Sequence, residues 1–421
     1  MNRVDNSGAK LWIAMTRPIR LPIALATAQT LHARFPGGIH LLREHSNWWE
    51  HGNWKPFASE FKSRHVFERV ATCRGLRDLS RLYRESRERQ SRLSALPINR
   101  DTDVILCFGG TVTLANALVS AHPDVFRILC ISSKAYQDLT ATGDAWHFRF
   151  TTSGWLQNRI IEPRVGLERT LDFKPWINPG GDGVRLVRLQ RTPGEIYDAV
   201  IVLSNSGHEL RKDAPGNVIA ARFPSIGELR AISEKIASEQ DRRRRVIFFG
   251  TPFLLIHNLP PEVYIKHLDL CLDYIRRHYG GDRDLIYRPH PAERNEAARL
   301  NLDGFEIEDD REVAELYFLR HFESIDAVFS VSSTVSRTAL NNGFNAYCLW
   351  RCFPFPQSSA SFFEKVMGEV PPEFDIRDLS RPPVPYADRA TSHDDALSFS
   401  AALESALEMR RREAIPQSAR N

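Results

Sequence analysis

A histidine held between two prolines is the first feature of the sequence that could carry chemistry. The segment Arg288-Pro289-His290-Pro291 follows the apolar run Leu285–Tyr287. Proline fixes its own φ and restricts the residue before it, so the backbone around this imidazole is stiff. A rigid imidazole can donate to a phosphate oxygen or protonate a leaving group. Arg288, predicted on the same face, could add charge-assisted hydrogen bonds to an anion; a histidine that only caps a turn is the alternative.

A cluster of hydroxyls follows a second apolar run. Ser332, Ser333 and Thr334 come directly after Ala327–Val331 and open a helical pattern. One hydroxyl at a helix N-cap satisfies the amides of the first turn. The remaining hydroxyls and N–H groups, together with the helix dipole, favour a phosphate. Capping alone needs one such residue, so this crowding favours an anion site.

Both motifs lie in a stretch where short apolar runs alternate with helical patterns, which predicts a parallel sheet. Ligands of such sheets bind beyond the carboxyl ends of the strands, where both motifs fall. We expect the two strands to be neighbours and one phosphate to bridge both motifs. A helix over Ala292–Leu300 is predicted to follow the histidine.

A chain of 421 residues exceeds one ordinary core and predicts two domains. The fold class expected is α/β, with two doubly wound Rossmann-type domains that face an interdomain cleft. We place the first domain at residues 1–241 and the second at residues 242–421, with the last helix, Asp394–Arg412, as a candidate to cross back to the first.

The composition excludes several classes of protein. With 42% hydrophobic residues, 26% charged residues and a net charge of +4, the chain is typical of a globular protein and does not call for a nucleic-acid partner. The polar N-terminus and the absence of a long apolar stretch predict a cytoplasmic location. The basic run Arg242–Arg245 leaves peripheral association with the inner membrane as an alternative. Six scattered cysteines, with no CxxC pair, predict neither disulfides nor a metal site.

Three segments together resemble a known family: Val246–Pro252, Tyr287–Glu293 and Ser332-Ser333. They look like the C-terminal half of bacterial sialyltransferases and polysialyltransferases, which have the GT-B architecture. The resemblance therefore implies a GT-B-like fold, with residues 1–241 as the acceptor-side domain and residues 242–421 as the nucleotide-sugar-binding domain. The resemblance implies an inverting, metal-independent transferase that moves a sugar from a donor such as CMP-sialic acid to a glycan acceptor in capsule polysaccharide or lipooligosaccharide. It places His290, Ser332 and Ser333 on the donor phosphate and Gly250 and Thr251 near the nucleotide. The CMP-sugar is a co-substrate, and no separate cofactor is implied.

The general base is the weak point of the resemblance. The family carries an acidic pair followed by glycine in its first domain, and this chain has no such triplet. Asp182, which precedes Gly183, is the nearest match and the predicted base, and Asp138 and Asp144 are the alternatives. Arg17 and Arg20, after the first strand, could bind the donor's carboxylate or the acceptor; a plain helix N-terminus at the surface is the alternative.

Other functions fit the same motifs. Within the fold, these are a cytidine-nucleotide-dependent polyol-phosphate transferase, a Kdo transferase of capsule or teichoic-type polymers, and a nucleotide-sugar epimerase. From another class, the chain could be a GT-B-like binding protein that has lost its base and its activity. Activity with an intact donor separates this last alternative from the enzymes.

Overall fold

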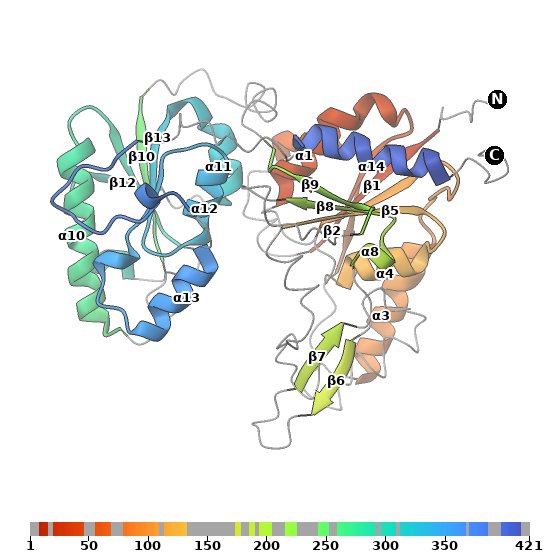
Figure 1. The fold of residues 1–421 in the computed structure, drawn as a ribbon, viewed down its shortest axis with the longest axis horizontal. Helices are drawn as coiled ribbons and strands as arrows, with labels where there is room; N and C mark the ends of the chain where they lie inside the picture. Colours follow the sequence, from red (N-terminus) through yellow and green to blue (C-terminus); the bar gives the residue numbers. More distant parts are fainter. Residues whose placement is uncertain are drawn as a thin grey trace. The chain divides into compact units, whose positions relative to one another are not determined.

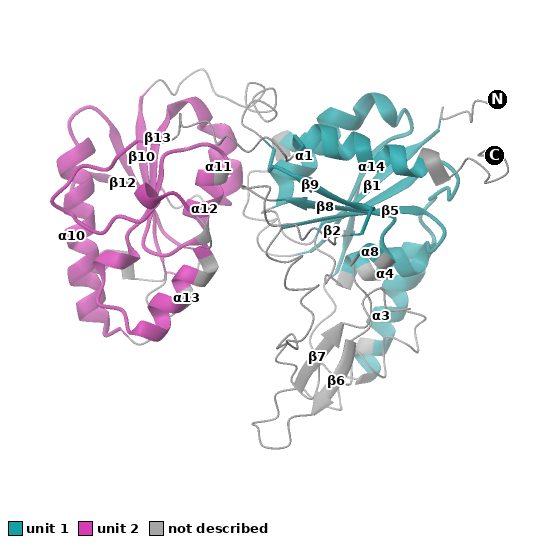
Figure 2. Ribbon diagram, viewed as in Figure 1, with its two compact units in different colours: residues 1–50, 55–224, 393–421 teal, residues 51–54, 225–392 magenta. Residues whose placement is uncertain are grey.

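The chain folds into two compact units, drawn in different colours in Figure 2. Unit 1 consists of Met1–Glu50, Lys55–Pro224 and His393–Asn421, and unit 2 of His51–Trp54 and Ser225–Ser392. The computed structural model describes residues 8–15, 20–45, 55–68, 79–108, 113–132, 173–177, 185–189, 193–203, 215–224, 243–251, 259–290, 293, 296–308, 312–367, 370–385 and 397–413. Unit 1 thus gives way to unit 2 after residue 224, where the sequence placed the change at 241, and the last helix returns to unit 1.

Unit 1 is built on a seven-stranded parallel sheet with the order β3-β2-β1-β4-β5-β8-β9. The order reverses between β1 and β4, as in a doubly wound fold. The strands are β1 (Lys10–Met15), β2 (Gly38–Glu44), β3 (Ser63–Phe67), β4 (Val104–Phe108), β5 (Phe126–Ser132), β8 (Ala199–Leu203) and β9 (Val218–Ala221). A separate antiparallel pair, β6 (Phe173–Ile177) and β7 (Arg185–Leu189), was not predicted from the sequence.

Helices cover both faces of this sheet (Figure 1). One face carries α1 (Leu21–Leu31) and α14 (Phe399–Glu413), and the other carries α3 (Leu79–Ser94), α4 (Thr113–Ala121) and the short α8 (Pro193–Ile196). Helix α1 is apolar almost all round because it packs on the sheet with α14 beside it on the same face. The Arg34–Glu404 ion pair, at 2.8 Å, joins the 3₁₀ turn His32–Arg34, which follows α1, to α14.

The amino ends of the first strands in unit 1 are joined by polar contacts. The buried carboxylate of Asp103 accepts hydrogen bonds from the Lys10 amide at 3.0 Å and from Trp12 Nε1 at 2.9 Å. The ring of Trp12 stacks on His40 of β2, with 4.3 Å between centroids. These contacts fix the register of β1 against its neighbours at the edge opposite the one where ligands of such sheets bind.

Unit 2 is built on a five-stranded parallel sheet with the order β12-β11-β10-β13-β14. Its strands are β10 (Arg245–Phe249), β11 (Asp284–Arg288), β12 (Phe305–Ile307), β13 (Ile325–Ser330) and β14 (Ala346–Cys348). Figure 1 shows α10 (Pro261–Tyr279) on one face and α11 (Ala314–Arg320) and α12 (Thr334–Asn341) on the other. A further helix, α13 (Gln357–Met367), follows the last strand.

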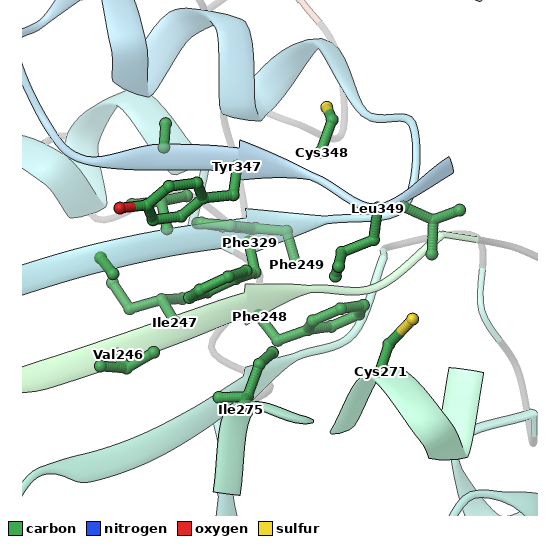
Figure 3. Packing of buried hydrophobic residues seen from close by; sticks show 14 of the residues in the cluster. Val246, Ile247, Phe248, Phe249, Cys271, Ile275, Phe329, Tyr347, Cys348 and Leu349 are labelled. Atoms are coloured by element: carbon green, nitrogen blue, oxygen red, sulfur yellow. The ribbon is translucent and has the colours of Figure 1, made fainter. Parts of the chain in front are cut away.

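The core of unit 2 contains a row of aromatic rings across four strands. Tyr287, Phe248, Phe329 and Tyr347 occupy paired positions on β11, β10, β13 and β14. Phe248 stacks on Tyr287 with 5.7 Å between centroids, and Phe329 stacks on Tyr347 with 4.9 Å. Figure 3 shows part of this row beside Ile275 of α10. Because side chains alternate along a strand, the next residue of each strand points to the other face.

The predicted fold class is confirmed: the chain is an α/β protein of two doubly wound Rossmann-type units, a GT-B-like architecture. The predicted cleft between the units stays a prediction. The predicted helix Ala292–Leu300 is wrong over its described residues, since only the 3₁₀ turn Glu296–Arg299 forms and Glu293 lies outside any helix. The side chain of Glu293 instead binds the backbone of His290, which holds the chain in a turn.

Candidate functional site at the carboxyl edge of unit 2

Three central strands of unit 2 end beside one another at the edge where the predicted site residues lie. Gly250 follows β10, His290 follows β11, and Ser332-Ser333 follow β13. The strand order reverses between β10 and β13, the position at which open α/β sheets bind ligands. The expectation that β11 and β13 are neighbours is wrong, because β10 lies between them and separates them by about 10 Å. The end of β10 is therefore the middle of the site.

His290 is half-buried, and its backbone is fixed by Glu293. The His290 amide donates to Glu293 Oε2 at 2.7 Å, and the Glu293 amide donates to the His290 carbonyl at 2.7 Å. Burial lowers the pKa of the His290 imidazole below its usual value of 6.5. At neutral pH this ring is therefore uncharged, with one N–H donor and one acceptor.

Glu293 is the residue at this edge that the sequence analysis did not single out. Its Oε1 accepts a hydrogen bond from the Tyr287 hydroxyl at 3.1 Å, while Oε2 binds the His290 amide. A Cβ added to Gly250 would lie 2.5 Å from Glu293 Oε2 and 2.7 Å from the Tyr287 hydroxyl. Glycine at position 250 thus makes room for the carboxylate. The signal in the sequence is an acid shortly after a strand end, placed to reach back to a backbone N–H.

Thr251 and Tyr264 lie on the α10 side of the same edge. Burial raises the pKa of Tyr264, the Glu293 carboxylate raises it further, and the Thr251 hydroxyl partly offsets this. Tyr264 is consequently protonated across the working range of pH. The Gly250 amide donates to the Arg288 carbonyl at 2.9 Å, so it continues the sheet ladder. Ligand contacts of Gly250 and Thr251 stay predictions.

Arg288 lies on the opposite face of the sheet, against α11. Its side chain is 4% exposed, and its guanidinium lies 3.9 Å from the Tyr317 ring centroid and 5.6 Å from that of Phe249. It donates to the Glu312 carbonyl at 3.2 Å, and the Glu312 side chain pairs with Arg320. These contacts fasten the end of β11 to the start of α11. A contact between Arg288 and a phosphate stays a prediction.

The hydroxyl cluster divides into structural and partly exposed members. Ser333 caps α12, accepting from the Val335 amide at 3.2 Å. Ser330 and Ser336 are buried and hydrogen bond to each other at 2.7 Å, and Ser336 also donates to the Tyr347 carbonyl. Ser332 is partly exposed, between the strand and the helix. The crowding of hydroxyls is thus explained in part by packing around the start of α12.

The remaining predicted site residues belong to unit 1. Arg17 and Asp182 lie outside the described residues. Arg20 occupies the N-cap position of α1 without a side-chain capping bond, beyond the carboxyl end of β1. Burial raises the pKa of Cys130, at the end of β5, to about 12, and the charge of Arg20 acts in the opposite direction. Arg20 therefore lies close to the end of β5, and its contact with a ligand stays a prediction.

Two absences among the described residues concern a metal site and a membrane-spanning helix. Within those ranges, no group of three or more histidine, cysteine, aspartate or glutamate side chains is arranged to hold a metal ion. Among the described helices, none has the length and apolar character needed to span a membrane.

Comparisons with known proteins find similarity only at the level of solved structures. No family model and no curated protein matches the chain. The UDP-GlcNAc 2-epimerase of Neisseria meningitidis, bound to UDP-GlcNAc, matches with 12% identity and a TM-score of 0.49 over 96% of this chain and 100% of its own. The S. aureus MnaA–UDP co-structure matches with 11% identity and a TM-score of 0.45, covering 81% of this chain and 78% of its own.

A bacterial sialyltransferase is also among the matching structures. The alpha/beta-galactoside alpha-2,3-sialyltransferase of Photobacterium phosphoreum matches with 9% identity and a TM-score of 0.42, over 93% of this chain and 98% of its own. At these identities and TM-scores, none of the three likenesses assigns a ligand or an activity to this chain.

Proposed function

We propose that the chain is a GT-B glycosyltransferase, sialyltransferase-like, that transfers a sugar from a CMP-activated donor to a glycan acceptor. The observation that carries the proposal is the pairing at one sheet edge of a half-buried, uncharged His290 with the capped N-terminus of α12. They flank the end of β10, where the strand order reverses. The resemblance of the two motifs to those of sialyltransferases supplies the donor class.

The chemistry follows from what a CMP-sugar loses. Its leaving group is a phosphate monoester, whose negative charge grows as the bond to the sugar breaks. The N–H groups and dipole at the start of α12 stabilise that charge, and Ser332 adds a hydroxyl beside them. The imidazole of His290 donates its N–H to a phosphate oxygen, a fixed donor of the kind that stabilises transition states.

The acceptor half of the reaction requires a base. Inversion at the sugar carbon needs a carboxylate that removes the proton of the acceptor hydroxyl. We assign this role to Asp182 and donor-carboxylate or acceptor binding to Arg17 and Arg20, on sequence grounds. We further propose a metal-independent reaction on acceptors of capsule polysaccharide or lipooligosaccharide, at the cytoplasmic side of the inner membrane and in peripheral contact with it.

Calorimetric titration with CMP, UMP and CDP, without divalent metal, tests the donor site. We expect CMP to bind wild-type protein and to bind the His290→Ala variant at least tenfold more weakly. The matched control is His278→Ala, a partly exposed histidine at the far end of α10, near the opposite edge of the sheet. Equal CMP affinity in both variants removes His290 from the site. Binding of UMP in preference to CMP refutes the cytidine assignment.

Turnover of an intact donor then separates the alternatives. A cytidine-nucleotide-dependent polyol-phosphate transferase or a Kdo transferase uses the same phosphate site but transfers a different group, which mass spectrometry of the acceptor product identifies. A binding protein without activity binds CMP and leaves CMP-sugars intact in the presence of every acceptor.

A further inference from the structure

We infer that Cys352 and Cys271 form a peroxide-sensitive dithiol in unit 2, in which Cys352 is oxidised first and Cys271 then closes a reversible disulfide with it. Both residues are free thiols in this structure. They are far apart in the sequence, and the fold brings them together. Neither belongs to the proposed nucleotide site, so the pair is a separate feature of unit 2.

One face of α10 packs on the chain segment that follows β14. Tyr264, His267 and Cys271 share this face, because residues three, four or seven apart lie on one side of a helix. The Tyr264 ring lies 5.2 Å from that of Phe353, and His267 Nδ1 donates to the Cys352 carbonyl at 3.0 Å. Cys271 lies one turn beyond His267, and its thiol hydrogen bonds with that of Cys352. Packing along the helix therefore holds the two sulfurs together.

The two sulfurs differ in access to solvent and in acidity. Cys271 is fully buried in the core of unit 2, as Figure 3 shows, whereas Cys352 is partly exposed. The hydrogen bond from Cys271 lowers the pKa of the Cys352 thiol, and burial opposes this effect. The same bond and burial both raise the pKa of Cys271. Because the thiolate is the reactive form of cysteine, an oxidant from solvent reacts with Cys352 first.

Hydrogen peroxide supplies the oxidant for a balanced reaction. The Cys352 thiolate attacks one peroxide oxygen, the O–O bond breaks, and the departing hydroxide takes up a proton to become water; Cys352 is now a sulfenic acid. The Cys271 sulfur then attacks the Cys352 sulfur, the S–O bond breaks, and the oxygen leaves as water with the Cys271 proton. Two thiols and one peroxide thus yield a disulfide and two waters, and two electrons pass from sulfur to oxygen.

The disulfide joins α10 to the segment after β14. Protonated Cys352 donates from Sγ to the Ile376 carbonyl at 3.3 Å, a bond that the disulfide replaces with a covalent link to the helix. The chain loop that this link closes contains β11, β12, β13 and β14, four of the five strands of the sheet. A closed loop of this length restricts the unfolded chain. Oxidation should therefore raise the Tm of unit 2 by about 5 °C or more, and a dithiol reductant should remove the increase.

Peptide mapping by mass spectrometry, after treatment with hydrogen peroxide and without reductant, tests the pairing. In wild type we expect the peptides of Cys271 and Cys352 to be joined, and dithiothreitol to separate them. In Cys271→Ser the oxidation should stop at the Cys352 sulfenic acid, so dimedone should label that residue about tenfold more than in wild type. In Cys352→Ser the Cys271 thiol should stay reduced. Cys348→Ala, which removes a buried cysteine of β14, is the matched control and should behave as wild type.

Three outcomes would overturn the assignment. The first is folded wild type in which peroxide leaves both thiols reduced or joins either of them to another cysteine. The second is dimedone label on Cys271 in folded Cys352→Ser, which would make the buried thiol the reactive one. The third is oxidised wild type that melts below the reduced protein, because the native packing then does not accommodate the bond. Circular dichroism shows whether each variant is folded, and the mapping of wild type decides the pairing even where a variant is not.

Discussion

Replacement of Arg288 by methionine tests whether the arginine of the Arg-Pro-His-Pro segment stabilises the fold. The guanidinium is buried against the Tyr317 ring and donates to the Glu312 carbonyl. A desolvated cation–π contact contributes about 2 kcal/mol, and an unpaired buried carbonyl costs about 1 kcal/mol or more. Methionine retains the apolar volume of the side chain. Arg288→Met should therefore lower the free energy of unfolding by about 3 kcal/mol.

Thermal unfolding of the purified variant measures this effect. For a domain of this size, about 3 kcal/mol corresponds to a fall in Tm of about 6–12 °C. CMP affinity, measured well below the Tm where the variant is folded, should stay close to that of wild type. The reason is that the contacts of the guanidinium lie on the α11 face. A variant that melts with wild type but binds CMP tenfold more weakly would refute the structural role and place Arg288 on the ligand.

Three further predictions concern His290, Gly250 and His40. His290→Ala should lower kcat about 100-fold, with a smaller effect on donor KM and an unchanged Tm; unchanged turnover in a stable variant removes the residue from the site. Gly250→Ala forces its Cβ against the Glu293 carboxylate, so Tm should fall in differential scanning calorimetry. CMP affinity should also drop, because the displaced carboxylate no longer holds the His290 amide. A wild-type Tm together with wild-type CMP affinity would contradict that geometry. Burial lowers the pKa of His40 in the folded state, so the unfolded chain binds more protons below pH 6.5 and stability is lost as pH falls. Tm should decrease from pH 7 to pH 5, and less steeply in His40→Gln; parallel curves would exclude His40 as the cause.

Much of the fold could be predicted because parallel strands buried on both faces are read as uninterrupted apolar runs. The apolar run Leu285–Tyr287 lies within β11, and the run Ala327–Val331 overlaps β13 and ends one residue beyond it. Strand order could not be predicted, since periodicity along one strand carries no information about its neighbours. The insertion of β10 between β11 and β13 is therefore visible only in the structure.

The sequence predicts which strand ends carry the candidate residues, but it does not predict how their side chains are oriented. Polar residues after apolar runs indicate the carboxyl edge, and the structure places His290, Ser332 and Ser333 there. Arg288 is the last residue of β11, so its side chain follows the alternation of the strand. That alternation directs it toward α11. Glu293 was assigned to a helix because its neighbours are helix formers; a hydrogen bond to the His290 amide overrides that local propensity.

The alternation of side chains along β11 determines on which face of the sheet each charged group at this edge lies. Tyr287 points toward α10 and holds the Glu293 carboxylate on that face, whereas Arg288, next along the strand, points toward α11. An anion and a cation are thus fixed on opposite faces of one strand end, with the uncharged imidazole of His290 beyond them. The alternation along β11 therefore places the buried guanidinium of Arg288 against α11, where its contacts hold the end of the strand, and leaves the Glu293 carboxylate on the α10 face.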